Sequence, residues 1–155
     1  MRAVVQRVAS ASVVVAGEVV GSVGHGLLVY LGCGRGDLAS DAAWMLDKIV
    51  GLRVFENGAG KLDRALLDVG GELLVVSQFT LYGDLRKGRR PSFEGAMAPD
   101  EAAQLYAGFV ALARERYPTL GVATGRFRAD MRVTSVNEGP VTLWLESPRP
   151  AEMVS

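Results

Sequence analysis

Three polar side chains follow an apolar run directly and are the first candidates for a reactive site. Residues 73–76 are Leu-Leu-Val-Val, which predicts a strand buried on at least one face. Ser77, Gln78 and Thr80 come immediately after it. A rigid strand holds such groups at the edge of a sheet, where backbone N–H groups can leave the ladder and face a ligand. The pattern predicts a binding or catalytic site at this strand end.

A basic loop follows the strand end. Its four cations lie within five residues and surround Gly88: they are Arg86, Lys87, Arg89 and Arg90. Cations at this density repel one another unless an anion lies across them, and glycine lets the backbone approach a ligand closely. A solvated loop is the alternative interpretation. Because this loop continues a polar strand end, we favour a phosphate-binding segment beside a reaction site.

The chain offers few groups for nucleophilic or metal chemistry. His25 is the only histidine and lies in a Gly-His-Gly turn, which makes a Ser/His/Asp triad an awkward proposal. Cys33 is the only cysteine, so an internal disulfide and a cysteine zinc site are excluded. We therefore expect hydrolytic chemistry without an imidazole base, and no metal or other cofactor.

Length and charge limit the class of protein. The 155 residues suit one domain with a real hydrophobic core, and 49% of them are hydrophobic. Seventeen basic and seventeen acidic residues balance, which argues against bulk nonspecific binding to nucleic acid and makes the positive charge a local feature. No stretch approaches the roughly 18 apolar residues of a membrane span, and residues 1–7 do not form a signal-peptide core. We expect a cytoplasmic protein with no membrane partner.

The secondary-structure pattern predicts an α+β domain with a largely antiparallel sheet. Apolar positions at helical spacing predict one helix capped by Ser40, and Pro99 begins a second. Residues 62–69 are ambiguous, either a short helix or an irregular connector. The helices are expected at residues 40–52 and 99–117, and the strands at residues 2–15, 18–23, 26–31, 53–55, 73–76, 131–136 and 141–146.

Two motifs resemble those of a known family. Ser-Gln-Phe-Thr-Leu at residues 77–81, followed by Asp84 and by Arg-Lys-Gly-Arg-Arg-Pro-Ser-Phe at 86–93, resembles the signature of the D-aminoacyl-tRNA deacylases, also called the D-tyrosyl-tRNA deacylase family. Asn-Glu-Gly-Pro-Val-Thr at residues 137–142 resembles the family's Gly-Pro motif. The similarity runs in matching order to Glu146. It implies a barrel-like sheet packed with two main helices, a deacylase domain at residues 1–147 and a flexible tail at 148–155.

The resemblance also implies an activity and a set of site residues. It implies hydrolysis of the ester between a D-amino acid and tRNA, with Ser77, Gln78, Phe79 and Thr80 as the catalytic segment. In that family the amides at the Gln78 and Phe79 positions face the oxyanion that forms from the ester carbonyl. Thr80 is a nucleophile, a substrate contact or a support, and a nucleophile would need an adjacent base. We prefer activation of water by the neighbouring 2′-OH of the tRNA ribose.

A second implied feature is a chirality gate that two subunits share. In the family the Gly-Pro bond, here Gly139-Pro140, is cis, and one subunit of a homodimer inserts it into the active site of the other. Its carbonyl oxygens receive the α-amino group, and an L side chain has no room, whereas glycyl-tRNA(Ala) is accepted. Arg7 matches an arginine that holds this loop, with a solvent-facing strand arginine as the alternative. Without the resemblance, Asn-Glu-Gly-Pro between two strands predicts an ordinary turn.

Other functions and some departures from the family stay open at this point. A noncatalytic RNA-binding module would use the basic loop, and a threonine-nucleophile amidase or esterase would leave that loop without a purpose. Glu138, Gly83 and Leu85 differ from the usual family residues without an expected consequence. Arg128 replaces a glycine, and we expect it to alter the pocket or the path of the tRNA.

Overall fold

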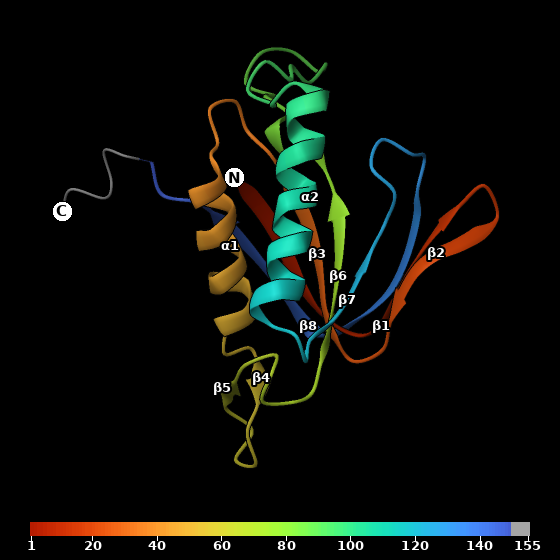
Figure 1. The fold of residues 1–155 in the computed structure, drawn as a ribbon, viewed down its shortest axis with the longest axis vertical. Coiled ribbons are helices and arrows are strands. Elements are labelled where there is room, and N and C mark those ends of the chain that lie inside the picture. The colour runs from red at the N-terminus through yellow and green to blue at the C-terminus, as the bar shows by residue number, and fades with distance from the viewer. Residues whose placement is uncertain (150–155) are drawn as a thin grey trace.

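Strand β1 (Arg2–Val15) is the element on which the sheet is built (Figure 1). The structure, a computed structural model, describes residues 1–149. In it β1 pairs antiparallel with β2 (Glu18–Val23), β3 (Gly26–Gly32) and β8 (Arg132–Glu146). Ala16 and Gly17 join β1 to β2, and both have the positive φ that a tight two-residue hairpin needs, 49° and 81°. The predicted hairpin is confirmed.

The sheet continues through two parallel pairs and almost closes on itself. β3 pairs with β6 (Glu72–Ser77), and β6 pairs with β7 (Gly121–Thr124). The end strands β2 and β7 then meet, because a Cβ atom on Gly21 would lie only 2.2 Å from the carbonyl oxygen of Thr124. Only glycine allows this approach. The predicted α+β domain with a largely antiparallel, barrel-like sheet is confirmed.

Two helices lie side by side over one face of the sheet (Figure 1). Helix α1 (Ala39–Gly51) and helix α2 (Pro99–Arg116) bury apolar stripes against β3 and β6, with Met45 and Phe109 fully buried between the layers. The second helix begins at Pro99 as predicted. The predicted cap at Ser40 is wrong, because Leu38 is the cap residue and the helix begins at Ala39; the Asp41 carboxylate accepts a hydrogen bond from the Leu38 N–H at 2.8 Å.

A small second sheet lies at the opposite end of the molecule from the start of α2 (Figure 1). It consists of β4 (Phe55–Glu56) and β5 (Leu62–Arg64), paired antiparallel. The prediction of a helical or irregular connector at residues 62–69 is therefore wrong for its first part. The Glu-Asn-Gly-Ala-Gly turn at residues 56–60 sends the chain back, so a hairpin forms where hydrophobic periodicity gave no signal.

Strand β8 is one continuous strand, whereas the sequence predicted two strands joined by a Gly-Pro turn. Both halves stay paired with β1, and Gln6 lies opposite Thr142 while Val8 lies opposite Asn137. Four residues of β8, 138–141, therefore face the single residue Arg7. We call residues 138–141 the Gly-Pro bulge. A bulge bends a strand and redirects its backbone without ending the ladder, which is why two predicted strands are one.

The N-terminus of the chain is held by two polar contacts. The N-terminal ammonium of Met1 lies 2.8 Å from the Asp37 carboxylate and donates to Ser147 Oγ at 2.7 Å, so the start of β1 is fastened to the end of β8. Of the tail predicted at residues 148–155, residues 150–155 lie outside those that the structure describes. Neither helix in the described part of the chain combines the length and hydrophobicity that a membrane crossing requires.

Candidate functional site

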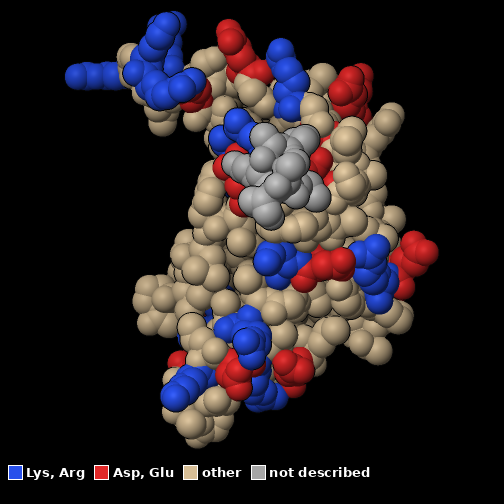
Figure 2. Space-filling view, turned by 90° about the vertical axis from the view of Figure 1, so that its left-hand side faces the viewer, with Lys and Arg blue, Asp and Glu red and all other residues tan. Residues whose placement is uncertain are grey.

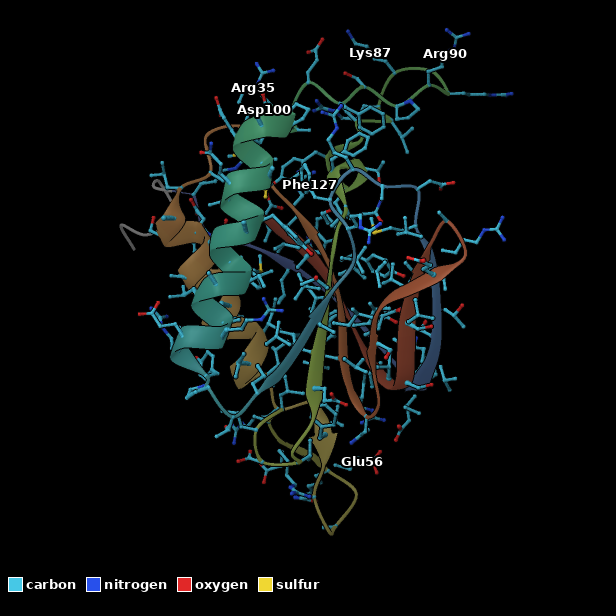
Figure 3. All side chains as sticks on the ribbon, turned by 45° about the vertical axis from the view of Figure 1, so that its right-hand side comes forward. Arg35, Glu56, Lys87, Arg90, Asp100 and Phe127 are labelled. Atoms are coloured by element: carbon cyan, nitrogen blue, oxygen red, sulfur yellow. The ribbon has the colours of Figure 1, made fainter. Side chains whose placement is uncertain are left out.

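A cavity of about 600 Å³ opens where β6 ends. Its wall combines the strand end, the first residues of α2 and the segment that leads into β8, which includes Phe127, labelled in Figure 3. Ser77, Gln78 and Phe79 lie on this wall, whereas Thr80 is exposed just beyond it. The other residues of the wall are mostly apolar: Leu31, Cys33, Val76, Phe93, Ala96, Met97, Ala98, Pro99, Ala102, Tyr106, Phe127, Arg128, Ala129, Met131 and Val133.

The backbone changes direction at the strand end. The N–H of Gln78 still donates to Leu31 O at 2.8 Å and is the last bond between β3 and β6. The chain then enters a single 3₁₀ turn, η1 (Phe79–Tyr82). The first amides of such a turn have no partner within it, and those of Phe79 and Thr80 have no acceptor anywhere in residues 1–149. The amides without a partner at this strand end are therefore those of Phe79 and Thr80, whereas the Gln78 amide, which the resemblance assigned to the oxyanion, is bonded within the ladder.

Gln78 instead acts through its side chain. Its amide Nε2 donates a short hydrogen bond to Thr80 Oγ1 and so fixes the orientation of the hydroxyl. A carboxamide NH₂ group cannot accept a proton, so this neighbour does not activate Thr80 as a nucleophile. The Thr80 hydroxyl hydrogen stays available to be donated to a ligand. The geometry therefore suits Thr80 as a hydrogen-bond donor.

The wall of the cavity provides no general base. It contains no histidine, aspartate, glutamate or lysine. Its two weakly acidic groups are neutral at physiological pH: burial raises the pKa of Tyr106 to about 12, and burial together with the negative charge of Asp37 raises the pKa of Cys33 to about 11. The Tyr106 hydroxyl donates to Val75 O at 2.8 Å and supports the strand end. The wall itself therefore offers no carboxylate or imidazole side chain for proton transfer.

The basic loop projects from the same end of the molecule. Lysine and arginine side chains gather at the projecting corner in Figure 2, and Figure 3 shows Lys87 and Arg90 pointing away from the body of the protein. Two backbone bonds between Asp84 and Ser92, of 2.7 and 2.9 Å, close the base of the loop. Within residues 1–149, Arg86 forms an ion pair, unlike the other three cations of the loop. Its guanidinium pairs with Asp84 at 2.7 Å and lowers the pKa of that carboxyl to about 2.

Arg7 and the Gly-Pro bulge form a second cluster. Arg7 is only 6% exposed, and its guanidinium donates to Glu138 O at 3.1 Å and to Val54 O at 2.8 Å. The Gly139-Pro140 peptide bond is cis, and a Cβ atom on Gly139 would lie 2.9 Å from Arg7 Nη2. The structure therefore joins Arg7 directly to the bulge, and Arg7 is not a solvent-facing strand residue.

This cluster lies far from the cavity of the same chain. Arg7 pairs with Leu27, and Leu27 pairs with Leu73, four residues before Ser77. At about 3.3 Å per residue the two sets are separated by roughly 13 Å along the sheet. Figure 3 shows the same separation, with Glu56, which lies beside Arg7, at the opposite end from Phe127. His25 also lies at this far end, 3.9 Å from Glu138. A single chain thus does not bring all the predicted site residues together.

Arg2 is a site residue that sequence reasoning missed. Its guanidinium donates to Leu81 O at 3.0 Å and lies 4.4 Å from the centre of the Tyr82 ring, so it supports the 3₁₀ turn from behind. Seventy-nine residues separate Arg2 from Leu81, and no spacing in the sequence signals the contact. Within residues 1–149, no group of three or more His, Cys, Asp and Glu side chains is placed to hold a metal ion.

Fold and site together define a small α+β protein with a base-free, amide-bearing cavity, and the comparisons with known proteins agree on its family. The family described as D-Tyr-tRNA(Tyr) deacylase matches residues 4–146, and the chain belongs to this family. It is 58% identical over 147 residues to the D-aminoacyl-tRNA deacylase of Desulfitobacterium hafniense, covering 95% of this chain and 97% of that one. It is also 58% identical to the D-aminoacyl-tRNA deacylase of Myxococcus xanthus over 151 residues, which is 97% of each chain.

A solved structure extends the comparison. The protein named c-Myc DNA Unwinding Element Binding Protein superposes with a TM-score of 0.91 at 42% identity. The match covers 96% of this chain and all of that one. Nearly the whole fold is therefore shared with that solved structure.

Cys33 gives a test of the cavity's electrostatics. Because its pKa is raised to about 11, we expect iodoacetamide at pH 8 to label the folded protein more than about 100-fold more slowly than the unfolded protein, whose thiol has an ordinary pKa. Labelling of the folded protein should accelerate as the pH rises from 8 to 10. Mass spectrometry of timed samples, with protein in urea as the control, measures both rates. Equal rates in the folded and unfolded protein would contradict a neutral, buried thiol.

Proposed function

We propose that this protein hydrolyses the ester bond between a D-amino acid and tRNA, and that residues 1–147 form the deacylase domain. The observation that carries the proposal is the cavity at the strand end, where an unpaired amide of Phe79 lies on a wall without any general base. Family membership supports the same substrate. The activity serves chiral proofreading of aminoacyl-tRNA.

The reaction is addition of water to the ester carbonyl. The carbonyl oxygen becomes an oxyanion that accepts hydrogen bonds from the Phe79 and Thr80 amides, and the Thr80 hydroxyl donates to the bound substrate. The intermediate then collapses to the free amino acid and the 3′-hydroxyl of the terminal ribose. Because the wall provides no base, the vicinal 2′-OH of that ribose assists the attack of water. Ser77 and the Gln78 side chain hold the strand end and Thr80 in place.

Chirality is read by backbone atoms of a second subunit. The Gly-Pro bulge is exposed and lies too far from the cavity of its own chain to contact a ligand there. Strand β8 pairs only with β1 and exposes apolar side chains, with Trp144 51% exposed and Val136 56% exposed. A homodimer would cover these residues and bring the bulge, held by Arg7, to the partner's cavity. The Gly139 and Pro140 carbonyls then accept the α-ammonium group and leave no room for an L side chain.

Two consequences follow for substrates. Glycine has no side chain for the gate to reject, so glycyl-tRNA(Ala) is also a substrate. Lys87, Arg89 and Arg90, which have no partner in residues 1–149, bind phosphates near the acceptor end of the tRNA. Arg86 contributes less, because Asp84 already neutralises it.

A noncatalytic nucleic-acid-binding module is the second candidate function. The exposed cations of the basic loop favour it, and the name of one similar solved structure describes binding to a DNA element. This alternative predicts binding without turnover, so an assay of ester cleavage separates the two functions.

The two mirror-image esters provide the test of the proposed function. We expect the purified protein to release D-tyrosine from D-tyrosyl-tRNA and to cleave L-tyrosyl-tRNA at least about 100-fold more slowly, because a clash in a rigid pocket costs several kcal/mol. Acid-precipitable label followed over time measures both rates. Equal cleavage of both esters would contradict the chirality gate, and cleavage of neither would favour the binding module.

Thr80 provides the test of the mechanism. We expect Thr80→Ala to retain deacylation with kcat lowered roughly 10- to 100-fold, because one hydrogen bond to the substrate is lost while both amides remain. Thr80→Ser should keep most of the activity. Single-turnover rates, with circular dichroism to check folding, make the measurement. Complete loss of activity in folded Thr80→Ala would indicate a threonine nucleophile.

Subunit mixing tests whether the site is shared. Ala98→Trp fills the cavity, and Gly139→Ala disturbs the bulge, so each homodimer should be nearly inactive. After the two are unfolded and refolded together, half of the dimers are mixed, and each of these has one site with an intact cavity and an intact partner bulge. We expect about a quarter of wild-type activity in the mixture. A mixture no more active than its parts would show that each chain uses its own bulge.

A further inference from the structure

The turn that carries Arg128 is an unusual place for an arginine. The Ala129 N–H donates to Arg126 O at 3.1 Å, which closes a four-residue turn with Arg128 at its third position. Arg128 has a φ of 64°, in the left-handed region that this position of a type II turn requires. Glycine adopts this conformation freely, whereas a long side chain is disfavoured there. A strained backbone position that keeps a bulky residue points to a role for the side chain.

Arg128 is also the only charged residue on the cavity wall described above. It is exposed, and its guanidinium has no hydrogen bond or ion pair within residues 1–149. Phe93, three residues after the last cation of the basic loop, lies on the wall of the same cavity. Unpaired cations therefore stand near the cavity on two segments, 86–90 and 126–129, that are far apart in sequence. A chain of negative charges that enters the cavity would meet both.

We propose that Arg128 binds a backbone phosphate at the 3′ end of the tRNA, next to the nucleoside that occupies the cavity. This proposal rests on the proposed function and names a contact that the basic loop alone does not supply. A planar guanidinium forms paired hydrogen bonds to phosphate, which a single ammonium group does not reproduce. A phosphate fits better than a carboxylate side chain of the amino acid, because the proposed substrate carries a phosphate backbone and the segment that holds Lys87, Arg89 and Arg90, unpaired within residues 1–149, reaches the cavity wall at Phe93.

Arg126 offers a matched control for this contact. It lies in the same turn, is exposed and has no side-chain partner in the described residues, but it is not on the cavity wall. We expect Arg128→Met to raise KM for D-tyrosyl-tRNA roughly tenfold with kcat little changed, since a charged hydrogen bond is lost. The slope of log(kcat/KM) against log of the salt concentration should fall by about 0.7, the value for one phosphate on a single strand. Arg126→Met should change both quantities much less.

Two further substrates test whether the anion that Arg128 binds is a phosphate. The ester 3′-O-D-tyrosyl-adenosine contains no phosphate, so Arg128→Met should cleave it as well as the wild-type protein does. If Arg128→Met loses as much activity on this nucleoside ester as on D-tyrosyl-tRNA, the phosphate contact is overturned and Arg128 acts within the cavity itself. If Arg128→Met loses activity on D-aspartyl-tRNA alone, Arg128 binds the amino-acid side chain, which also overturns the proposal.

Arg128→Gly separates binding from folding. Glycine relieves the left-handed backbone, so we expect an equal or higher melting temperature together with the same rise in KM. A lower melting temperature would show that the arginine serves the fold instead. If the wild-type protein does not cleave D-tyrosyl-tRNA, the proposed function and this contact are both overturned. Wild-type cleavage with Arg128→Met equal to Arg126→Met would overturn the phosphate contact alone.

Discussion

The site depends on one backbone hydrogen bond, from the Gln78 N–H to Leu31 O. It is the last bond of the parallel ladder between β3 and β6, and the 3₁₀ turn begins immediately beyond it. A longer β3–β6 ladder would next engage the Thr80 amide, because alternate residues of a strand bond to the same neighbour, and a shorter ladder would release Gln78 and loosen the turn. The end of the ladder thus decides which amides face the cavity. Arg2 and Tyr106 hold this end from the two sides by binding the carbonyls of Leu81 and Val75.

The electrostatic character of the cavity follows from its position. Strand β3 and helix α2 are packed for burial, so the groups that reach the cavity from them are apolar or weakly acidic. Burial keeps Cys33 and Tyr106 neutral by raising each pKa, and neither group can accept a proton. The wall of the cavity therefore carries no carboxylate or imidazole side chain that would accept a proton at neutral pH. Charge is confined to the entrance, where the basic loop and Arg128 are exposed.

The Gly-Pro bulge changes the direction of the backbone within β8. A regular strand directs its N–H and C=O groups along the plane of the sheet, toward the positions of neighbouring strands. Four residues placed opposite Arg7 remove the backbone from the ladder while both flanks stay paired. The buried Arg7 guanidinium donates hydrogen bonds to Glu138 O in the bulge and to Val54 O, and so ties the bulge to the segment that leads into the small second sheet. A rigid and exposed backbone segment results, at the end of the molecule away from the cavity.

Local pattern in the sequence determined much of this protein: the hairpin at Ala16-Gly17, the helix that begins at Pro99, the polar strand end and the exposed basic loop all depend on near neighbours. The family motifs identified the segments that form the two clusters. Only the tertiary structure decided which amides are free, because the Gln78 N–H is bound by Leu31, forty-seven residues earlier. It also decided that residues 131–146 contain one strand, that residues 62–64 join a hairpin, and that Arg2 supports the turn. Hydrophobic periodicity reports burial and is insensitive to hydrogen-bond partners that are distant in sequence, so pairing and register emerge only when the chain is folded.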